Sequence, residues 1–306
     1  MKKKKVLVTG GYGFLGKYVM KELWQQDYEA ITFHSEQYDL VNSFSCYKVL
    51  KDFRPDAVIH LAASVGGIGA NMANPAAFFY KNLMMGVNLI EACRELEVGK
   101  FVQIGTVCSY PKFCDVPFNE DDLWEGYPEE TNAPYGIAKK TLLVMLQAYK
   151  KQYGFNSAYL IPTNMYGPGD NFDPQSSHVI PALIRKIDEA KKSDSDLVIW
   201  GTGNATREFL YAGDSARAIV KAMEEIDSPT PINLGGGQEI SINSLVSLLC
   251  ELMNFSGKVI YDGSKPDGQP RRLVDASLAE HLLSWRAEMD LREGLRSTIK
   301  YYEEKI

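Results

Sequence analysis

Short, nearly unbroken hydrophobic runs alternate with longer amphipathic segments through the first half of the chain. Runs of this kind are typical of strands that are buried on both faces of a parallel sheet. The longer segments carry apolar residues at helical spacing. This alternation predicts an α/β fold in which helices cover a doubly wound parallel sheet. The predicted strands are 6–8, 30–33, 57–61, 101–104 and 157–160, and the predicted helices are 14–25, 82–96 and 135–153.

A glycine triplet joins the first predicted strand to the first predicted helix, with glycines at positions 10, 13 and 16. Glycine permits a sharp turn of positive φ and lets a pyrophosphate approach the backbone, while the helix N-terminus supplies N–H groups. Glycine also serves turns that are purely structural. This turn, however, stands at the first strand-to-helix crossing, where a dinucleotide-binding fold requires it. It therefore predicts a Rossmann domain that binds NAD or NADP.

The end of the second predicted strand leaves the choice between NAD and NADP open. An acid at this position would bind the ribose 2′-hydroxyl, and a basic residue would favour a 2′-phosphate. The strand runs into His34, Ser35 and Glu36, which supply neither cleanly. Glu36 lies a few residues late and could equally be a solvated loop residue. Asp39 is expected to belong to the adenine pocket.

The regular alternation of strands and helices ends after about Pro162. Residues 166–171 are rich in glycine and proline, and the later elements are shorter and less regular. No low-complexity linker and no internal repeat separates the two parts, so we expect them to pack tightly. We predict an NAD(P)-binding Rossmann domain over 1–165. We predict a mainly substrate-binding region over 166–306, part of which returns to the Rossmann domain.

Composition narrows the possible partners. The chain has 306 residues, of which 45% are hydrophobic, and 33 basic and 39 acidic residues give a net charge of −6, so nothing indicates binding to nucleic acid. No apolar stretch approaches the ~20 residues of a membrane helix, and the run after the N-terminal lysines is too short for a signal peptide. The five cysteines lack metal-ligand spacing and do not form a disulfide framework. We expect a cytoplasmic protein without a metal site.

A phenol and an ammonium occur four residues apart at Tyr135 and Lys139, which places them on one face of a helix. A nearby ammonium lowers a tyrosine pKa from about 10 and makes the phenol a usable proton donor and acceptor. The same spacing recurs at Tyr47 and Tyr301, so the spacing alone is weak evidence. Tyr135, however, opens the helix after the fourth predicted strand. The end of that strand carries Thr106, a hydroxyl placed to orient a substrate carbonyl.

The chain resembles the extended short-chain dehydrogenase/reductases in four features: the glycine turn at 10–16, the sequence His-Leu-Ala-Ala at 60–63, Thr106, and the pair Tyr135 and Lys139. Within that superfamily the chain closely resembles the GDP-L-fucose synthase family, whose members are GDP-4-keto-6-deoxy-mannose epimerase/reductases. The segments that carry this resemblance are 65–68, 108–112, 162–168, 170–172, 177–183, 207–210 and 265–268.

The resemblance implies an enzyme that forms a homodimer and acts on a nucleotide-sugar. NADP(H) is favoured on the resemblance alone, and NAD(H) is not excluded. Tyr135 would protonate the C4 oxygen as hydride arrives at C4, with Lys139 tuning the phenol and Thr106 holding the carbonyl. The predicted cofactor contacts are Gly10, Gly13, Phe14, Leu15, Gly16, Asp39, Leu40, Leu61, Ala62, Ala63, Tyr135, Lys139, Pro162, Asn164 and His178. The implied substrate contacts are Asn164, Val179, Lys186, Trp200, Arg207 and Lys265.

Cys108 and His178 match the acid/base pair that inverts C3 and C5 in the family. The chemistry is sound because a C4 ketone acidifies the hydrogens on both neighbouring carbons. A thiolate and an imidazole can exchange such hydrogens near neutral pH. Considered alone, Cys108 could be a small buried hydrophobe and His178 a capping or solvated residue.

The chain departs from the family at several positions. Thr106 stands where serine is usual, Tyr12 where an arginine often helps to hold the NADP phosphate, and Lys186 where arginine is common. The stretch 121–128 also differs. Two related activities therefore stay open: reduction at C4 only, on a GDP-4-keto deoxyhexose or heptose, or another nucleotide-sugar epimerase/dehydratase reaction. A non-catalytic dinucleotide sensor is the alternative of a different class, but a sensor has no need of a proton relay.

Overall fold

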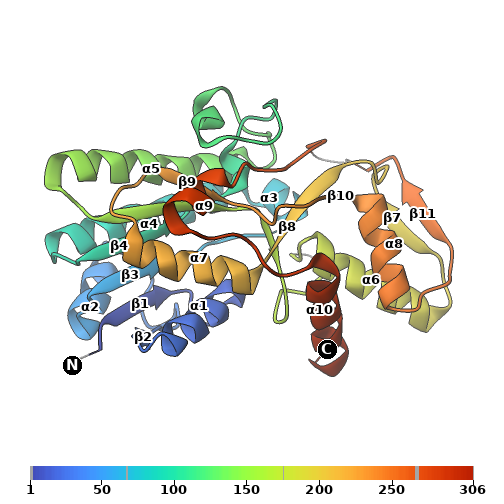
Figure 1. The fold of residues 1–306 in the computed structure, drawn as a ribbon, viewed down its shortest axis with the longest axis horizontal. Helices are drawn as coiled ribbons and strands as arrows, with labels where there is room; N and C mark the ends of the chain where they lie inside the picture. Colours follow the sequence, from blue (N-terminus) through green and yellow to red (C-terminus); the bar gives the residue numbers. More distant parts are fainter. Residues whose placement is uncertain (1–2, 67, 175, 266–268, 306) are drawn as a thin grey trace.

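A six-stranded sheet forms the centre of the larger part of the molecule (Figure 1). The structure is a computed structural model that describes residues 3–66, 68–174, 176–265 and 269–305. Every neighbouring pair of strands in the sheet is parallel, in the order β2-β1-β3-β4-β5-β9. The strands are β1 (Lys5–Thr9), β2 (Glu29–Ile31), β3 (Ala57–His60), β4 (Lys100–Ile104), β5 (Ser157–Pro162) and β9 (Pro231–Leu234).

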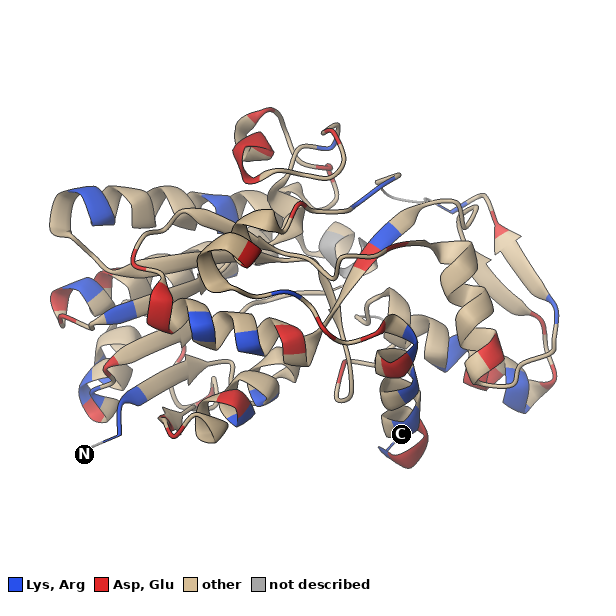
Figure 2. Ribbon diagram, in the orientation of Figure 1, with Lys and Arg blue, Asp and Glu red and all other residues tan. Residues whose placement is uncertain are grey.

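Successive residues of each central strand face two different hydrophobic cores. In β1, Val6 and Val8 lie in one core and Leu7 in the other, and in β3 Ile59 and Val58 divide in the same way. Because neither face of the sheet meets water, the strands read as unbroken hydrophobic runs rather than alternating ones. Charged residues lie mainly on helices and loops (Figure 2), and β3, β5 and β9 contain none.

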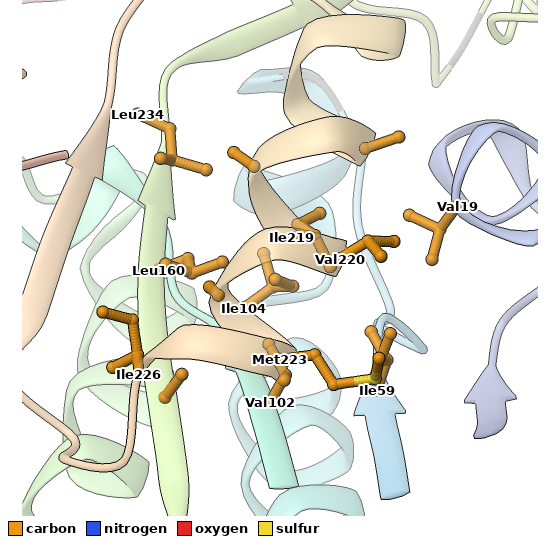
Figure 3. Packing of buried hydrophobic residues seen from close by; sticks show 14 of the residues in the cluster. Val19, Ile59, Val102, Ile104, Leu160, Ile219, Val220, Met223, Ile226 and Leu234 are labelled. Atoms are coloured by element: carbon orange, nitrogen blue, oxygen red, sulfur yellow. The ribbon is translucent and has the colours of Figure 1, made fainter. Parts of the chain in front are cut away.

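Three helices cover each face of the sheet, which confirms the predicted doubly wound α/β fold. One face is covered by α1 (Phe14–Gln25), α7 (Ala212–Glu225) and α9 (Ser277–Leu283), and the other by α2 (Ser43–Phe53), α4 (Pro75–Glu95) and α5 (Ala133–Tyr153). The short helix α3 (Ile68–Ala73) precedes α4. Figure 3 shows the first of these cores, where Val19 of α1 and Ile219 of α7 pack toward sheet residues such as Ile59 and Leu160.

A second, smaller part of the molecule contains two small sheets and its own core. Strand β8 pairs with β6 in parallel and with β10 in antiparallel fashion, and β11 pairs with β7 in parallel. The strands are β6 (Asn164–Tyr166), β7 (Leu197–Trp200), β8 (Thr206–Tyr211), β10 (Glu239–Ser241) and β11 (Val259–Asp262). The helices that pack with them are α6 (Val179–Ser193), α8 (Ile242–Leu252) and α10 (Leu291–Lys305).

The chain crosses between the two parts more than once. After β8 it returns to the large sheet through α7 and β9, and later through α9, before α10 ends in the smaller part (Figure 1). The proposed division after residue 165 falls within β6. Two 3-10 helices, η1 (Val107–Ser109) and η2 (Glu120–Trp124), follow β4.

Some predicted strand bounds were wrong, and each has a local cause. The strand predicted over 30–33 ends at Ile31, because Thr32 accepts the N–H of Gly11 at 3.1 Å through its side chain and Phe33 turns into the core. The strand predicted over 57–61 ends one residue earlier. The strand predicted over 157–160 continues to Pro162, where it still pairs with Leu234 of β9.

The helix predicted over 82–96 begins seven residues earlier, at Pro75. Proline fits the first turn of a helix, where its missing N–H has no partner to lose. Helix α5 likewise begins at Ala133, with Pro134 in its first turn, rather than at Tyr135. The sequence pattern did not predict α2, whose N-cap Asn42 accepts the N–H of Phe44 at 2.9 Å.

Candidate active site

The glycine turn after β1 forms a concave backbone cradle that has no room for side chains at its glycines. Gly10 has a φ of +72°, and a Cβ at Gly16 would lie 2.1 Å from the carbonyl oxygen of Gly10. Helix α1 starts at the N-cap Gly13, which offers no side chain to its N–H groups, and its first turn has no acidic residue. These N–H groups and the helix dipole are therefore available to an anion. The arrangement fits the pyrophosphate of a dinucleotide.

A buried histidine ties the ends of β1 and β3 together beside this cradle. The Thr9 hydroxyl lies 2.7 Å from Nδ1 of His60 and accepts the N–H of Ala62 at 3.2 Å. Burial, aided by the charge of Lys139, lowers the pKa of His60 to about 3, so its imidazole is neutral. The chain passes from β1 to β2 on one side and later to β3 on the other. This is the switch point at which open α/β sheets bind their ligands.

The predicted cofactor contacts lie in segments that follow several of these strands. One group forms the glycine turn and the first turn of α1, a second follows β3, and a third spans the end of β5 and the start of β6. Asp39 and Leu40 precede α2, where Leu40 is buried and the Asp39 carboxylate accepts the N–H of Val41 at 3.0 Å. The three groups are Gly10, Gly13, Phe14, Leu15 and Gly16; Leu61, Ala62 and Ala63; and Pro162 and Asn164.

At the end of β2, Tyr12 of the turn stacks on His34, with ring centroids 4.0 Å apart and planes 9° apart. The hydrogen bond between Gly11 and Thr32 holds the turn against this end of the strand. Segments 9–16 and 30–42 contain no lysine or arginine, whereas Glu36 and Asp39 are exposed there. These two segments therefore offer no permanent positive charge to a 2′-phosphate.

Thr106, Cys108 and Tyr135 meet where α5 packs on η1. The Thr106 hydroxyl accepts the N–H of Cys108 at 3.2 Å and also hydrogen-bonds the Tyr135 phenol. Ser109 donates to the carbonyl oxygen of Gly136 at 2.9 Å, and a Cβ at Gly136 would lie 2.3 Å from the carbonyl oxygen of Cys108. Only glycine allows this approach, so Gly136 is a site residue that the sequence analysis missed.

The electrostatics of the tyrosine differ from the sequence prediction. Burial raises the pKa of Tyr135 above its usual range, the nearby Cys108 adds to this, and the hydrogen bond with Thr106 lowers it. Lys139 is 2% exposed, and burial lowers its pKa to about 8. The sequence prediction that the ammonium lowers the phenol pKa was therefore wrong: burial raises that pKa, and the group that lowers it is Thr106 rather than Lys139. A protonated phenol is nevertheless the form required to donate a proton.

His178 occupies the N-cap position of α6, but its side chain makes no capping hydrogen bond. The residue is exposed to solvent, yet the protein packed around it lowers the pKa of its imidazole by desolvation. Cys108 hydrogen-bonds Thr106 through its backbone N–H and Arg272 through Sγ, and among the described residues no hydrogen bond joins it to His178.

Two predicted substrate residues, Lys186 and Lys265, lie over the indole of a third, Trp200, in the smaller part of the molecule. Trp200 is 61% exposed, and the ammonium groups of Lys186 and Lys265 lie 5.4 Å and 5.6 Å from its ring centroid. They come from β7, α6 and the loop after β11. An exposed aromatic face beside two cations suits a nucleotide, whose base can stack and whose phosphates carry negative charge.

The remaining predicted substrate residues lie around β8 and at the start of α6. Arg207 donates to the carbonyl oxygen of Gln269 at 2.6 Å, and Asn164 donates to the carbonyl oxygen of Glu208 at 3.0 Å. Val179 is the first residue of α6. In the segments used for the resemblance, Gly67 and residues 266–268 lie outside the described residues.

The sequence analysis also missed Gln269 and Arg272. Arg272 contacts Cys108 across 164 positions of the chain, and no local pattern marks such a pair. Over the described ranges, no helix combines the length and apolar character needed to cross a membrane, and no three His, Cys, Asp or Glu side chains gather as a metal site would require.

Comparison with known proteins identifies the family. The model of the NAD dependent epimerase/dehydratase family matches residues 6–235. This chain belongs to that family. It is 41% identical to a GDP-L-fucose synthase of Sinorhizobium fredii, covering 99% of this chain and 96% of that protein. It is 36% identical to a GDP-L-colitose synthase of Yersinia pseudotuberculosis, covering 97% of each. The resemblance to extended short-chain dehydrogenase/reductases is thereby confirmed.

Solved structures agree with this assignment. A GDP-6-OMe-4-keto-L-xylo-heptose reductase from C. jejuni superposes with a TM-score of 0.93 at 29% identity, covering 100% of this chain and 99% of that one. A GDP-L-fucose synthetase from Naegleria fowleri bound to NADP gives 0.91 at 30% identity, covering 99% and 94%. The family is one of NAD(P)-dependent nucleotide-sugar epimerases and reductases.

Replacing Tyr135 by Phe is expected to leave the fold and cofactor binding intact and to slow reduction by roughly 10²–10⁴, the usual cost of losing a general acid. Matched controls are Tyr47→Phe and Tyr301→Phe. Tyr47 donates to Glu95 at 2.6 Å from α2, and Tyr301 lies on α10. The measurements are circular dichroism, cofactor binding by fluorescence, and cofactor oxidation with a GDP-4-keto sugar. An equal loss of activity in either control would show that the chosen tyrosine is wrong.

The edge of the candidate cofactor site formed by Tyr12 and His34, at the end of β2, generates a second prediction. The chain should bind one reduced nicotinamide dinucleotide, and His34→Arg should raise the affinity for NADPH by roughly ten-fold, because a guanidinium can form a charge-assisted hydrogen bond with the 2′-phosphate. The affinity for NADH should stay the same, since it carries a hydroxyl there. Calorimetry with both cofactors tests this. An equal gain for NADH, or no binding of either cofactor by the parent protein, would contradict the assignment of this edge.

Proposed function

We propose that this protein is an NADPH-dependent epimerase/reductase of a GDP-4-keto-6-deoxy-hexose, with the activity of a GDP-L-fucose synthase. The observation that carries the proposal is the cluster of Thr106, Cys108 and Tyr135, in which a thiol lies beside a proton-donating phenol. A reductase needs only the phenol. The thiol supplies the second function, because it can remove a hydrogen that the neighbouring ketone has acidified.

In the reduction, the reduced nicotinamide supplies the hydride that C4 accepts. Tyr135 donates its phenolic proton to the C4 oxygen, and its raised pKa keeps that proton in place until the oxygen becomes basic. Thr106, which hydrogen-bonds the phenol, orients the carbonyl. Lys139, four residues along the same helix, stabilises the phenolate that the transfer leaves behind.

Epimerisation comes first, while the C4 ketone still acidifies C3 and C5. The Cys108 thiolate removes a proton from one carbon, and the electron pair is delocalised onto the C4 oxygen as an enolate. The His178 imidazolium returns a proton to the opposite face and restores the ketone. Proton exchange with solvent then restores the thiolate and the imidazolium, and a repeat of the step at the other carbon completes the change. The position of His178 at the start of α6, without a capping bond, leaves its ring free for this role.

The nucleotide is assigned to the smaller part of the molecule. Trp200, with Lys186 and Lys265 beside its ring, is proposed to hold the base and phosphates, and Arg207 to hold the diphosphate. The four relatives described above are named for GDP-sugars, which favours guanine. NADPH is proposed because the related Naegleria fowleri structure holds NADP. The absence of lysine and arginine from segments 9–16 and 30–42 is the feature that opposes NADPH.

A second candidate is reduction at C4 alone, on a GDP-4-keto heptose or deoxyhexose. Two observations favour it: the close superposition on a heptose reductase, and the lack of a hydrogen bond between Cys108 and His178 among the described residues. In that case both side chains would position substrate, and a separate epimerase would act upstream.

Solvent exchange separates the two candidates. When the protein is incubated with GDP-4-keto-6-deoxy-mannose in deuterated water without cofactor, deuterium should enter the sugar at C3 and C5, as detected by NMR. Cys108→Ala should stop the exchange, whereas Cys114→Ala, a change at another half-buried cysteine, should not. Efficient C4 reduction with no label at either carbon would reject epimerisation. A panel of GDP-, UDP- and dTDP-4-keto sugars then tests the nucleotide.

A further inference from the structure

A buried arginine points at the candidate thiol from the opposite side of the site. Arg272 precedes α9 in the chain and is 8% exposed, and its NH1 group lies 3.8 Å from Sγ of Cys108 as a hydrogen-bond donor. The backbone at Arg272 is fixed as well, because its carbonyl oxygen accepts the N–H of Glu208 in β8 at 3.1 Å. This guanidinium therefore has a defined place beside the sulfur.

The rest of the guanidinium is held by an amide. Nε and NH2 of Arg272 both donate to Oε1 of Gln269, each at 3.2 Å. Gln269 is itself 6% exposed and donates through Nε2 to the carbonyl oxygens of Pro111 at 3.4 Å and Lys112 at 3.2 Å. These bonds use one edge of the guanidinium and leave NH1 directed at Cys108. The backbone of Pro111 and Lys112, just after Cys108, therefore positions Arg272 through Gln269.

Arg272 lacks a carboxylate partner among the side chains that the structure describes. Its neighbour Arg271 differs, since it is exposed and forms a two-point ion pair with Glu239, with the closer contact at 2.7 Å. A buried cation is costly unless an anion or several hydrogen-bond acceptors balance it. A thiolate at Cys108 would be that anion.

We propose that Arg272 is a positioning residue that stabilises Cys108 as a thiolate and aims it at the sugar. The inference rests on the proposed function, because epimerisation is the step that needs a thiolate base. Proton removal from carbon requires the ionised sulfur, and a fixed cation within hydrogen-bond reach raises the ionised fraction at neutral pH. Gln269 also accepts Arg207 through its backbone oxygen, so one residue positions both the thiol's cation and the candidate diphosphate ligand.

The test is the pH dependence of alkylation of Cys108 by iodoacetamide in the full-length protein, followed by mass spectrometry of the peptide that contains Cys108. Arg272→Met should lower the rate at neutral pH by roughly ten-fold or more and move the midpoint of the pH profile upward. At high pH, where the thiol is ionised in both proteins, the variant should react at least as fast as the parent, because a more basic thiolate is more nucleophilic.

Three further variants make the result specific. Arg272→Lys retains the charge but cannot be held by Gln269 in the same way, so its midpoint should lie between those of the parent and Arg272→Met. Arg271→Met removes an exposed arginine from the adjacent position and should leave the profile unchanged. Arg272→Gln provides a second neutral variant if Arg272→Met does not give the circular dichroism of the parent.

An unchanged midpoint in both neutral variants would overturn the proposal. So would a rate that falls by the same factor at every pH, because that would indicate altered access to the thiol rather than altered ionisation. Alkylation needs no sugar, so its outcome is independent of the proposed function. The expected alkylation profiles together with no deuterium exchange into any 4-keto sugar would reject epimerisation and retain the effect of Arg272 on the thiol.

Discussion

Burial of the large sheet on both faces is the constraint on which the rest of this structure depends. Because helices cover both faces, the central strands carry few charged side chains: β3, β5 and β9 have none, and β1 and β4 have a lysine only at their first residue. Polar chemistry is displaced to the points where the parallel strands end. The glycine turn follows β1, and Thr106 follows β4, so the candidate cofactor cradle and the candidate proton donor lie at the same edge of the sheet.

Glycine permits the close approach of backbone segments at this edge in two places. The turn after β1 folds so tightly that a Cβ at Gly16 would overlap the carbonyl oxygen of Gly10. Helix α5 approaches η1 so closely that a Cβ at Gly136 would overlap the carbonyl oxygen of Cys108. The first approach exposes N–H groups to an anion, and the second brings the phenol of Tyr135 beside the thiol. Both depend on backbone contact rather than on side-chain packing.

The site is also marked by buried cations that no described carboxylate balances. Lys139 and Arg272 are both nearly inaccessible, and burial lowers the pKa of Lys139 to about 8. Glu208, a buried carboxylate whose backbone N–H donates to Arg272, instead accepts the N–H groups of Gly237 at 2.7 Å and Val274 at 3.2 Å. Buried cations of this kind favour anionic groups such as a thiolate and phosphates. That is the charge pattern expected for a nucleotide-sugar with an enolisable ketone.

The sequence by itself determined the features that burial imposes locally. Hydrophobic runs predicted strands that are covered on both faces, and the glycine triplet predicted a turn that has no room for Cβ atoms. The four-residue spacing of Tyr135 and Lys139 placed both on one face of a helix. Tertiary structure decided what depends on distant neighbours. The same spacing occurs at Tyr47. In the fold, however, Tyr47 lies on α2 and donates to Glu95 of α4, away from the site. The direction of the Tyr135 pKa followed from desolvation, which only the folded chain creates. The contact of Arg272 with Cys108 had no sequence signal, because residues 164 positions apart share no periodicity that a local pattern could record.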